Sequence, residues 1–140
     1  MAKEILTGLS VLHEMKIIHR DLKSANIFIS DGNYKLGDLN VSKLLKKNLA
    51  YTQTGTPYYA SPEVWKDQPY ELKSDIWSLG CIIYELCALR PPFTAHSMDG
   101  LYKKVLKGNY PKIPHSYSKA LEFLIGKCLQ QNPKDRPTAK

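Results

Sequence analysis

The chain has 140 residues, of which 43% are hydrophobic, and its 20 Lys plus Arg against 13 Asp plus Glu give a formal net charge of +7. This composition excludes a disordered chain and suffices for the packed core of one domain. The positive charge favours an anionic partner, such as a nucleotide, an acidic peptide, nucleic acid or a membrane surface, but does not distinguish among them.

Three cysteines without a C-x-x-C pair argue against a disulfide framework or a zinc site, and they fit a reducing compartment. The first residues, "MAKEILTG", lack the apolar region of a signal peptide. The longest apolar stretch, residues 76–89, is too short to span a bilayer and contains Glu85. We therefore expect an intracellular protein of the cytoplasm that has no membrane partner.

The first predicted elements are a helix and a hairpin. Apolar residues recur at helical spacing over residues 2–15, which predicts a helix. No Ser, Thr, Asp or Asn caps its start, so we expect this helix to be truncated at its N-terminal end. After an irregular stretch, "IFIS", "DGN" and "YKLG" predict a strand, a tight turn and a strand over residues 27–37. Residues 38–60 show no period, and a segment of that length without regular structure is usually functional.

The second half of the chain is predicted to be helical. A short helix is expected at residues 61–66, with Ser61 as its cap. Residues 73–89 are apolar around the whole circumference, which predicts a long helix buried on all sides. Amphipathic helices are expected at residues 97–107 and 117–130. With one visible hairpin, the sequence predicts a mainly helical domain.

Four polar side chains flank the predicted hairpin. Asn26 and Asp38 stand at its two ends, which a hairpin brings together, and their oxygens suit Mg²⁺. Asp21 could accept a hydroxyl proton, and Lys23 could neutralise charge on a moving phosphoryl group. These are the requirements of phosphoryl transfer. The alternative is that Asp21 and Asn26 only cap a loop, as such residues commonly do in turns.

Five motifs occur in the order found in the large lobe of eukaryotic protein kinases: "HRDLKSANIF", "GDLNVSK", "GTPYYASPE", "SDIWSLGCIIYEL" and "NPKDRP". The chain most resembles the NIMA-related kinases. The grounds are Gly37 before Asp38, the sequence of the motif "GTPYYASPE" and the segment "PFTAHSMDGLYKKVLKGNYPKIPHSYS". The resemblance implies the kinase α+β fold represented by its C-terminal lobe, with one small β-hairpin beside the catalytic loop.

The resemblance also assigns catalytic roles. It implies transfer of the γ-phosphoryl group of ATP to a protein Ser or Thr, with Mg²⁺. Asp21 would be the catalytic base, and Asn26 and Asp38 would hold the metal. Lys23 would contact the γ-phosphate, and Thr56 would form a hydrogen bond near Asp21 and Lys23.

Further roles come from the same resemblance. Phe28 would form the floor under the adenine. Arg20 would pair with a phosphate on the activation segment, and Thr52 is the expected phosphorylation site, with Thr54 as the second choice. A phosphate on Thr56 would repel the catalytic carboxylate, so that hydroxyl is expected to stay unmodified.

Four residues are expected to be structural. Glu63 and Arg136 would pair and brace the end of the activation segment. Asp75 would anchor the catalytic loop from the start of the long helix. His19 is expected to pack in the core rather than take part in chemistry.

The sequence departs from the family in two places. The metal motif reads Asp38-Leu39-Asn40 instead of Asp-Phe-Gly, which keeps the carboxylate. Residues 1–18 contain neither a G-x-G-x-x-G loop nor a V-A-I-K-like strand. We therefore expect residues 1–140 to be a partial kinase domain without its N-terminal lobe, and to be inactive alone.

Two competing functions remain open at this point. A catalytically inactive, kinase-like module that binds a protein partner is the alternative. A nucleic-acid binder rests only on the charge, because clustered Arg with interleaved aromatic residues is missing, so no nucleic-acid partner is expected. ATP and a protein substrate with Ser or Thr are the expected partners, and the resemblance allows association with the cytoskeleton.

Overall fold

The computed structural model describes residues 1–39 and 56–140. In these two ranges the elements are α1 (Ala2–Glu14), η1 (Ser24–Asn26), β1 (Ile27–Ser30), β2 (Asn33–Leu36), α2 (Pro62–Trp65), α3 (Leu72–Ala88), α4 (Met98–Lys107), α5 (Lys119–Cys128) and η2 (Pro133–Asp135). The predicted fold class, a helical lobe with one small hairpin, is confirmed. None of the described helices has the length and apolar character needed to cross a membrane.

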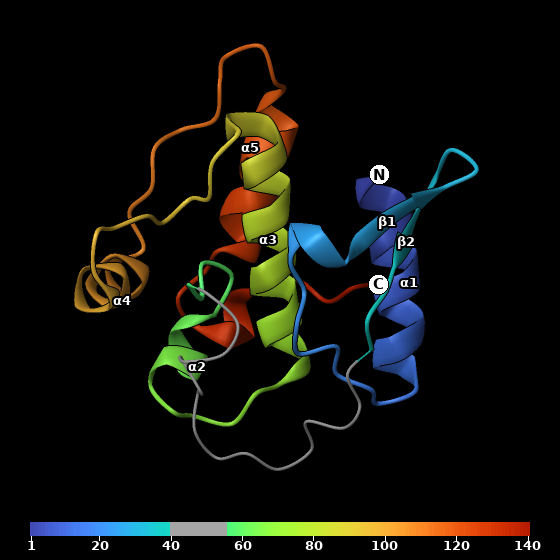
Figure 1. Ribbon diagram of the computed structural model, residues 1–140, viewed down its shortest axis with the longest axis horizontal. Coiled ribbons are helices and arrows are strands. Elements are labelled where there is room, and N and C mark those ends of the chain that lie inside the picture. The colour runs from blue at the N-terminus through green and yellow to red at the C-terminus, as the bar shows by residue number, and fades with distance from the viewer. Residues whose placement is uncertain (40–55) are drawn as a thin grey trace.

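The long helix α3 runs through the middle of the molecule, with α1 and the hairpin on one side and α4 on the other (Figure 1). A capping box between Glu71 and Ser74 starts it. Its middle is buried on every face, from Ser74 to Tyr84, as the sequence predicts. The last turn differs, because Leu86 is 46% exposed and Leu89, just after the helix, is 90% exposed. The expectation of burial on all sides is therefore wrong at this end.

The hairpin pairs β1 with β2 in antiparallel register, Ile27 opposite Leu36 and Ser30 opposite Asn33. Its turn has two residues, Asp31 with φ 52° and Gly32 with φ 74°. Positive φ at both positions is what a tight hairpin turn of this length requires. The turn is one residue shorter than the sequence predicts, and β2 starts one residue earlier.

Serine hydroxyl groups cap the N-terminal ends of α4 and α5 by accepting hydrogen bonds from main-chain N–H groups of the first turn. Ser97 Oγ accepts from Gly100 N at 3.1 Å, and Ser118 Oγ accepts from Leu121 N at 3.2 Å. Ser61 also precedes its helix, but its buried hydroxyl makes no hydrogen bond with any residue that the structure describes. Ser61 therefore occupies the cap position of α2 without the cap interaction that the sequence predicts.

Helix α5 lies close against α3. A Cβ added at Gly80 would lie 2.6 Å from Cys128 Cβ, so only glycine allows this approach.

The three cysteines, Cys81, Cys87 and Cys128, are all free and buried, and burial raises the pKa of each thiol. They act as small apolar core residues, as their place in the helices suggests.

Candidate active site

The loop between α1 and β1 brings three of the predicted catalytic residues into contact. Lys23 Nζ lies 3.0 Å from Asp21 Oδ2. Asn26 Nδ2 donates to the main-chain oxygen of Asp21 at 2.8 Å and to Asp21 Oδ2 at 3.2 Å. Both donors use the same carboxylate oxygen, and no described residue donates to Oδ1. Asp21 therefore has a fixed orientation and one oxygen available to a substrate hydroxyl.

Asp75, buried at the start of α3, holds the first part of this loop. Its Oδ2 accepts from the main-chain N–H of His19 at 2.9 Å and lies 2.9 Å from His13 Nε2. Its Oδ1 accepts from the main-chain N–H of Arg20 at 3.1 Å. Arg20 has φ 67°, a left-handed conformation that costs a non-glycine residue about 1–2 kcal/mol. The Asp75 carboxylate offsets that cost and fixes the residue just before Asp21.

The backbone of Gly37 joins the two ends of the hairpin. Gly37 N donates to Asn26 O at 3.0 Å, and His19 Nε2 lies 3.2 Å from Gly37 O. His19 is 2% exposed, so it packs in the core. Asp38 therefore follows a residue that is hydrogen-bonded to Asn26, although in the described residues the Asn26 side chain forms its hydrogen bonds with Asp21 and not with Asp38.

Asn26 and Asp38 are the described residues that could hold Mg²⁺. Asn26 is 5% exposed and uses both of its hydrogen bonds on its amide nitrogen, which leaves its oxygen as the atom suited to a hard cation. Asp38 is held at φ 56°. Among the described residues there is no group of three or more His, Cys, Asp or Glu that could hold a metal. A metal held by Asn26 and Asp38 would need further ligands besides these two described residues, and Mg²⁺ commonly takes such ligands from phosphates and water.

Phe28 presents an open ring surface beside this site. Its side chain is 52% exposed. A Cβ at Gly37 would lie 2.3 Å from Phe28 Cε2, so the ring rests directly on the glycine backbone. Gly37 is therefore required by packing, and not by its dihedral angles. A flat apolar surface of this kind suits an aromatic base.

Thr56 is exposed, and its main-chain oxygen accepts from Tyr58 N at 2.9 Å. In the described residues its hydroxyl makes no hydrogen bond with Asp21 or Lys23. The structure thus does not place Thr56 in the contact that the family resemblance implies.

Tyr59, which the sequence did not single out, makes the link from this segment to the catalytic loop. Its hydroxyl donates to Glu85 Oε2 at 2.7 Å and shares a hydrogen bond of 2.9 Å with Ser24 Oγ. Burial raises the pKa of Tyr59 to about 12, with Ser24 opposing and Glu85 adding to the effect. The hydroxyl therefore stays protonated near neutral pH and remains a donor.

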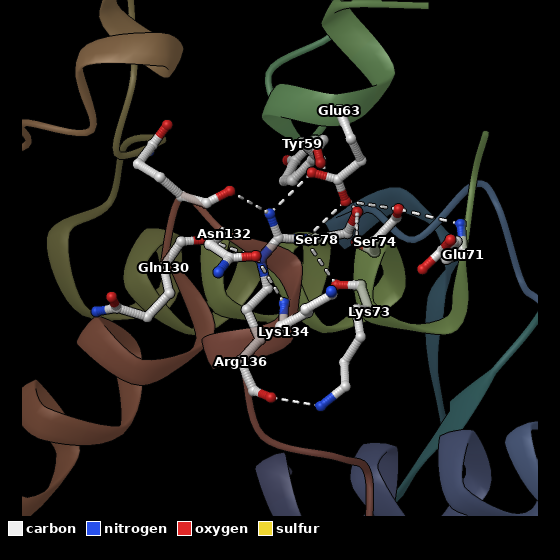
Figure 2. A network of polar contacts seen from close by, with 11 residues as sticks. Tyr59, Glu63, Glu71, Lys73, Ser74, Ser78, Gln130, Asn132, Lys134 and Arg136 are labelled. Carbon is white, nitrogen blue, oxygen red and sulfur yellow. Dashed lines mark hydrogen bonds and ion pairs between the residues drawn. The ribbon is translucent and has the colours of Figure 1, made fainter. Parts of the chain in front are cut away.

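A buried ion pair joins the segment after Thr56 to the end of the chain (Figure 2). Arg136 Nη1 and Nη2 donate to Glu63 Oε1 and Oε2 at 2.7 and 2.8 Å. Ser74 Oγ donates to the same carboxylate at 2.7 Å. Burial raises the pKa of Glu63, but the hydrogen bonds from Arg136 and Ser74 outweigh it and hold that pKa below its ordinary value. The pair is charged and fixes α2 to the segment after η2, and the hydrogen bond from Ser74 ties the same carboxylate to α3.

Arg136 is 2% exposed, yet its remaining donors are all used. They go to main-chain oxygens of Gln130 at 2.8 Å, Lys73 at 2.9 Å and Gln131 at 3.2 Å. Lys73 Nζ in turn donates to Arg136 O. The guanidinium also lies over the Trp77 ring, 5.1 Å from Cζ to the centroid. A buried charge is tolerated here because it is paired and fully hydrogen-bonded.

After Tyr59, His13 is the second residue of the site that the sequence did not single out, and it contacts Asp75. It lies four residues after the buried Leu9 on the same face of α1, and this spacing was the available signal for an inward-pointing polar group.

Three of the residues discussed in the sequence analysis, Asn40, Thr52 and Thr54, lie outside the described residues. The pairing expected between Arg20 and a phosphate on Thr52 therefore stays a prediction.

Comparison with known proteins agrees with this arrangement. The protein kinase domain family matches residues 1–140. Mus musculus serine/threonine-protein kinase Nek3 is 45% identical over 139 residues, which is 97% of this chain and 27% of that protein. Mus musculus serine/threonine-protein kinase Nek1 is 44% identical over 96% of this chain and 12% of its own length. A Dictyostelium discoideum protein, probable serine/threonine-protein kinase nek3, is 47% identical over 96% of this chain and 13% of its own length.

The chain thus spans about a quarter or less of the length of these curated relatives. The similarity runs through the catalytic loop, the hairpin, α3 and the brace formed by Glu63 and Arg136. The resemblance found in the sequence is confirmed. The chain belongs to the protein kinase family, in its Nek, or NIMA-related, serine/threonine branch.

Proposed function

We propose that the protein transfers the γ-phosphoryl group of ATP to Ser or Thr hydroxyls of proteins, and that residues 1–140 are the large lobe of its kinase domain. The contact cluster of Asp21, Lys23 and Asn26 carries this proposal, because it orients a carboxylate with one oxygen available. The three relatives described above support it, since each is named as a serine/threonine-protein kinase or a probable one.

In this mechanism Asp21 accepts the hydrogen of the substrate hydroxyl and aims its oxygen at the phosphoryl group. Lys23 and Asn26 fix the carboxylate, and Lys23 supplies positive charge near the transferring group. Mg²⁺, when bound, would neutralise phosphate charge, and Asn26 with Asp38 would hold it. Phosphoryl transfer needs little more from a protein than such positioning and charge stabilisation.

Residues farther away keep these groups in place. Asp75 fixes the backbone before Asp21, and the pair of Glu63 and Arg136 holds the segment after Thr56. Phe28 offers the proposed surface under the adenine, where its ring is half exposed. ATP as substrate and free buried thiols favour action in the cytoplasm, and association with the cytoskeleton stays a proposal.

The alternative of a kinase-like binding module is not favoured. Such a module has no need of an oriented carboxylate, yet Asp21, Lys23, Asn26 and Asp38 are all present, and the first three are in contact. The same alternative also predicts that changing the Asp21 carboxylate leaves phosphorylation unaffected, which the next experiment measures.

The test compares two isosteric substitutions. Because the 140 residues contain no glycine-rich phosphate loop, the small lobe of Mus musculus Nek3 is fused in front of Met1. Phosphorylation of a Ser-containing protein is then followed with ATP and Mg²⁺. Asp21→Asn should lower the rate by about 100-fold or more, the usual contribution of a positioned base.

Asp31→Asn is the matched control, since Asp31 is an exposed carboxylate in the hairpin turn. It should leave the rate unchanged. If a folded fusion protein shows the same phosphorylation with Asp21→Asn as without it, the proposed role of Asp21 is wrong and the binding module becomes the better account.

A further inference from the structure

A hollow of about 390 Å³ lies between the end of α3 and helix α4, away from the catalytic loop. Arg90, Pro91 and Pro92 line it from the segment after α3, and Lys104 and Lys107 line it from α4. In Figure 1 this region lies across α3 from α1 and the hairpin. The lining of the hollow therefore shares no described residue with the proposed catalytic site.

The charge of the hollow is of one sign. Three of its lining residues, Arg90, Lys104 and Lys107, are cationic, and none of the described residues that line it is a carboxylate. Lys103 on the same helix pairs with Asp99 at 2.7 Å, but no described carboxylate pairs with the three cations of the hollow.

The C-terminal end of α4 accounts for part of this charge, because lysines there interact favourably with the helix dipole. It accounts for Lys104 and Lys107 but not for Arg90, which belongs to a different segment. Lys104 Nζ also donates to Thr94 O at 2.6 Å, which holds this cation at the wall of the hollow. The positive charge is thus assembled from two elements and partly fixed in position.

Leu89 gives a second, independent observation next to Arg90. It is 90% exposed and has φ 56°, at a helix end where glycine is the usual residue. A leucine in this conformation costs about 1–2 kcal/mol relative to glycine and buries almost nothing in return. Leu86, three residues earlier in the last turn of α3, is 46% exposed. The end of α3 therefore displays apolar side chains beside a basic hollow.

We propose that the hollow and Leu89 bind an acidic segment of a partner protein, with carboxylates facing Arg90, Lys104 and Lys107 and an apolar residue against Leu89. The complementary charge identifies the ligand as an anion, and the exposed leucine favours a peptide over inorganic phosphate. The described residues that line the hollow include no aromatic ring, which is the stacking surface that a single-stranded nucleic acid uses.

The probe is a fluorescein-labelled acidic peptide with one central Leu, and its comparator has every Asp and Glu replaced by Asn and Gln. Fluorescence anisotropy with the full chain should show tighter binding of the acidic peptide, weakening as NaCl is raised. Arg90→Gln combined with Lys107→Gln should weaken binding about fivefold, the effect of losing two exposed ion pairs.

Lys103→Gln combined with Lys127→Gln is the matched control, because it removes the same charge from outside the hollow. It should leave the affinity unchanged. Leu89→Gly should weaken peptide binding while raising the urea midpoint of unfolding, a combination that a merely structural leucine cannot give.

Three results would overturn the proposal: equal affinity for the acidic peptide and its amide comparator, equal loss in the control pair, or unchanged binding with Leu89→Gly. Competition of equal strength by oligothymidylate or by phosphatidylserine vesicles would also overturn it, since it would indicate a general polyanion surface instead of a peptide site.

Discussion

Removing the Arg136 guanidinium should destabilise the chain more than any exposed substitution, and Arg136→Met performs this change with little loss of volume. Among the described residues, the substitution leaves Glu63, 6% exposed, with Ser74 as its remaining side-chain donor, and it removes one donor from each of three main-chain oxygens. Breaking a buried pair by removing one member costs about 3–5 kcal/mol, because the other charge stays buried. Domains have only about 5–15 kcal/mol of stability, so much of it would be lost.

The assay is urea unfolding followed by circular dichroism. Lys134→Met is the matched control, because Lys134 is exposed two residues away and has no side-chain partner in the described structure. Adding Glu63→Gln to Arg136→Met should recover part of the loss, since an amide costs less to bury than an unpaired carboxylate. If Arg136→Met costs no more than Lys134→Met, or if Glu63→Gln gives no recovery, the reasoning about the buried pair is wrong.

The same pair makes a pH prediction. The folded-state pKa of Glu63 lies below its ordinary value of about 4.5. A depressed folded pKa adds stability above the unfolded pKa, and this contribution disappears as the pH falls through the folded pKa. The free energy of unfolding should therefore fall with acid below about pH 4.5, and Arg136→Met should flatten that part of the curve.

Two further predictions concern the active site of the fusion protein. Gly37→Ala would place a Cβ 2.3 Å from the Phe28 ring, so the ring must move and the KM for ATP should rise, whereas the control Gly126→Ala, with its nearest atom at 3.8 Å, should leave the KM unchanged. Thr52→Ala should abolish activation by phosphorylation, because a phosphate on Thr52 can pair with cationic groups of the catalytic loop, whereas Thr54→Ala should keep this activation. The reverse result in a phosphorylation assay would assign the activating site to Thr54 instead.

Local sequence patterns predicted most of the helices and the hairpin. The apolar spacing of residues 2–15 and 73–89 gave α1 and α3 within one residue, except for the exposed end of α3. "DGN" located the turn, but its length depended on both Asp31 and Gly32 taking positive φ, which composition alone does not specify. At Ser61 the residue type correctly indicated the start of α2, but it did not predict that the side chain forms no capping hydrogen bond.

The sequence by itself determined which side chains could support phosphoryl transfer, since Asp21, Lys23 and Asn26 lie within one loop and their contacts are local. Only the tertiary structure decided how that loop is held. Asp75 reaches back more than 50 residues to His19 and Arg20, and Tyr59 meets Ser24 across 35. Periodicity reports the face that a residue occupies within its own element, but a contact between distant elements depends on how those elements pack, which no local pattern contains.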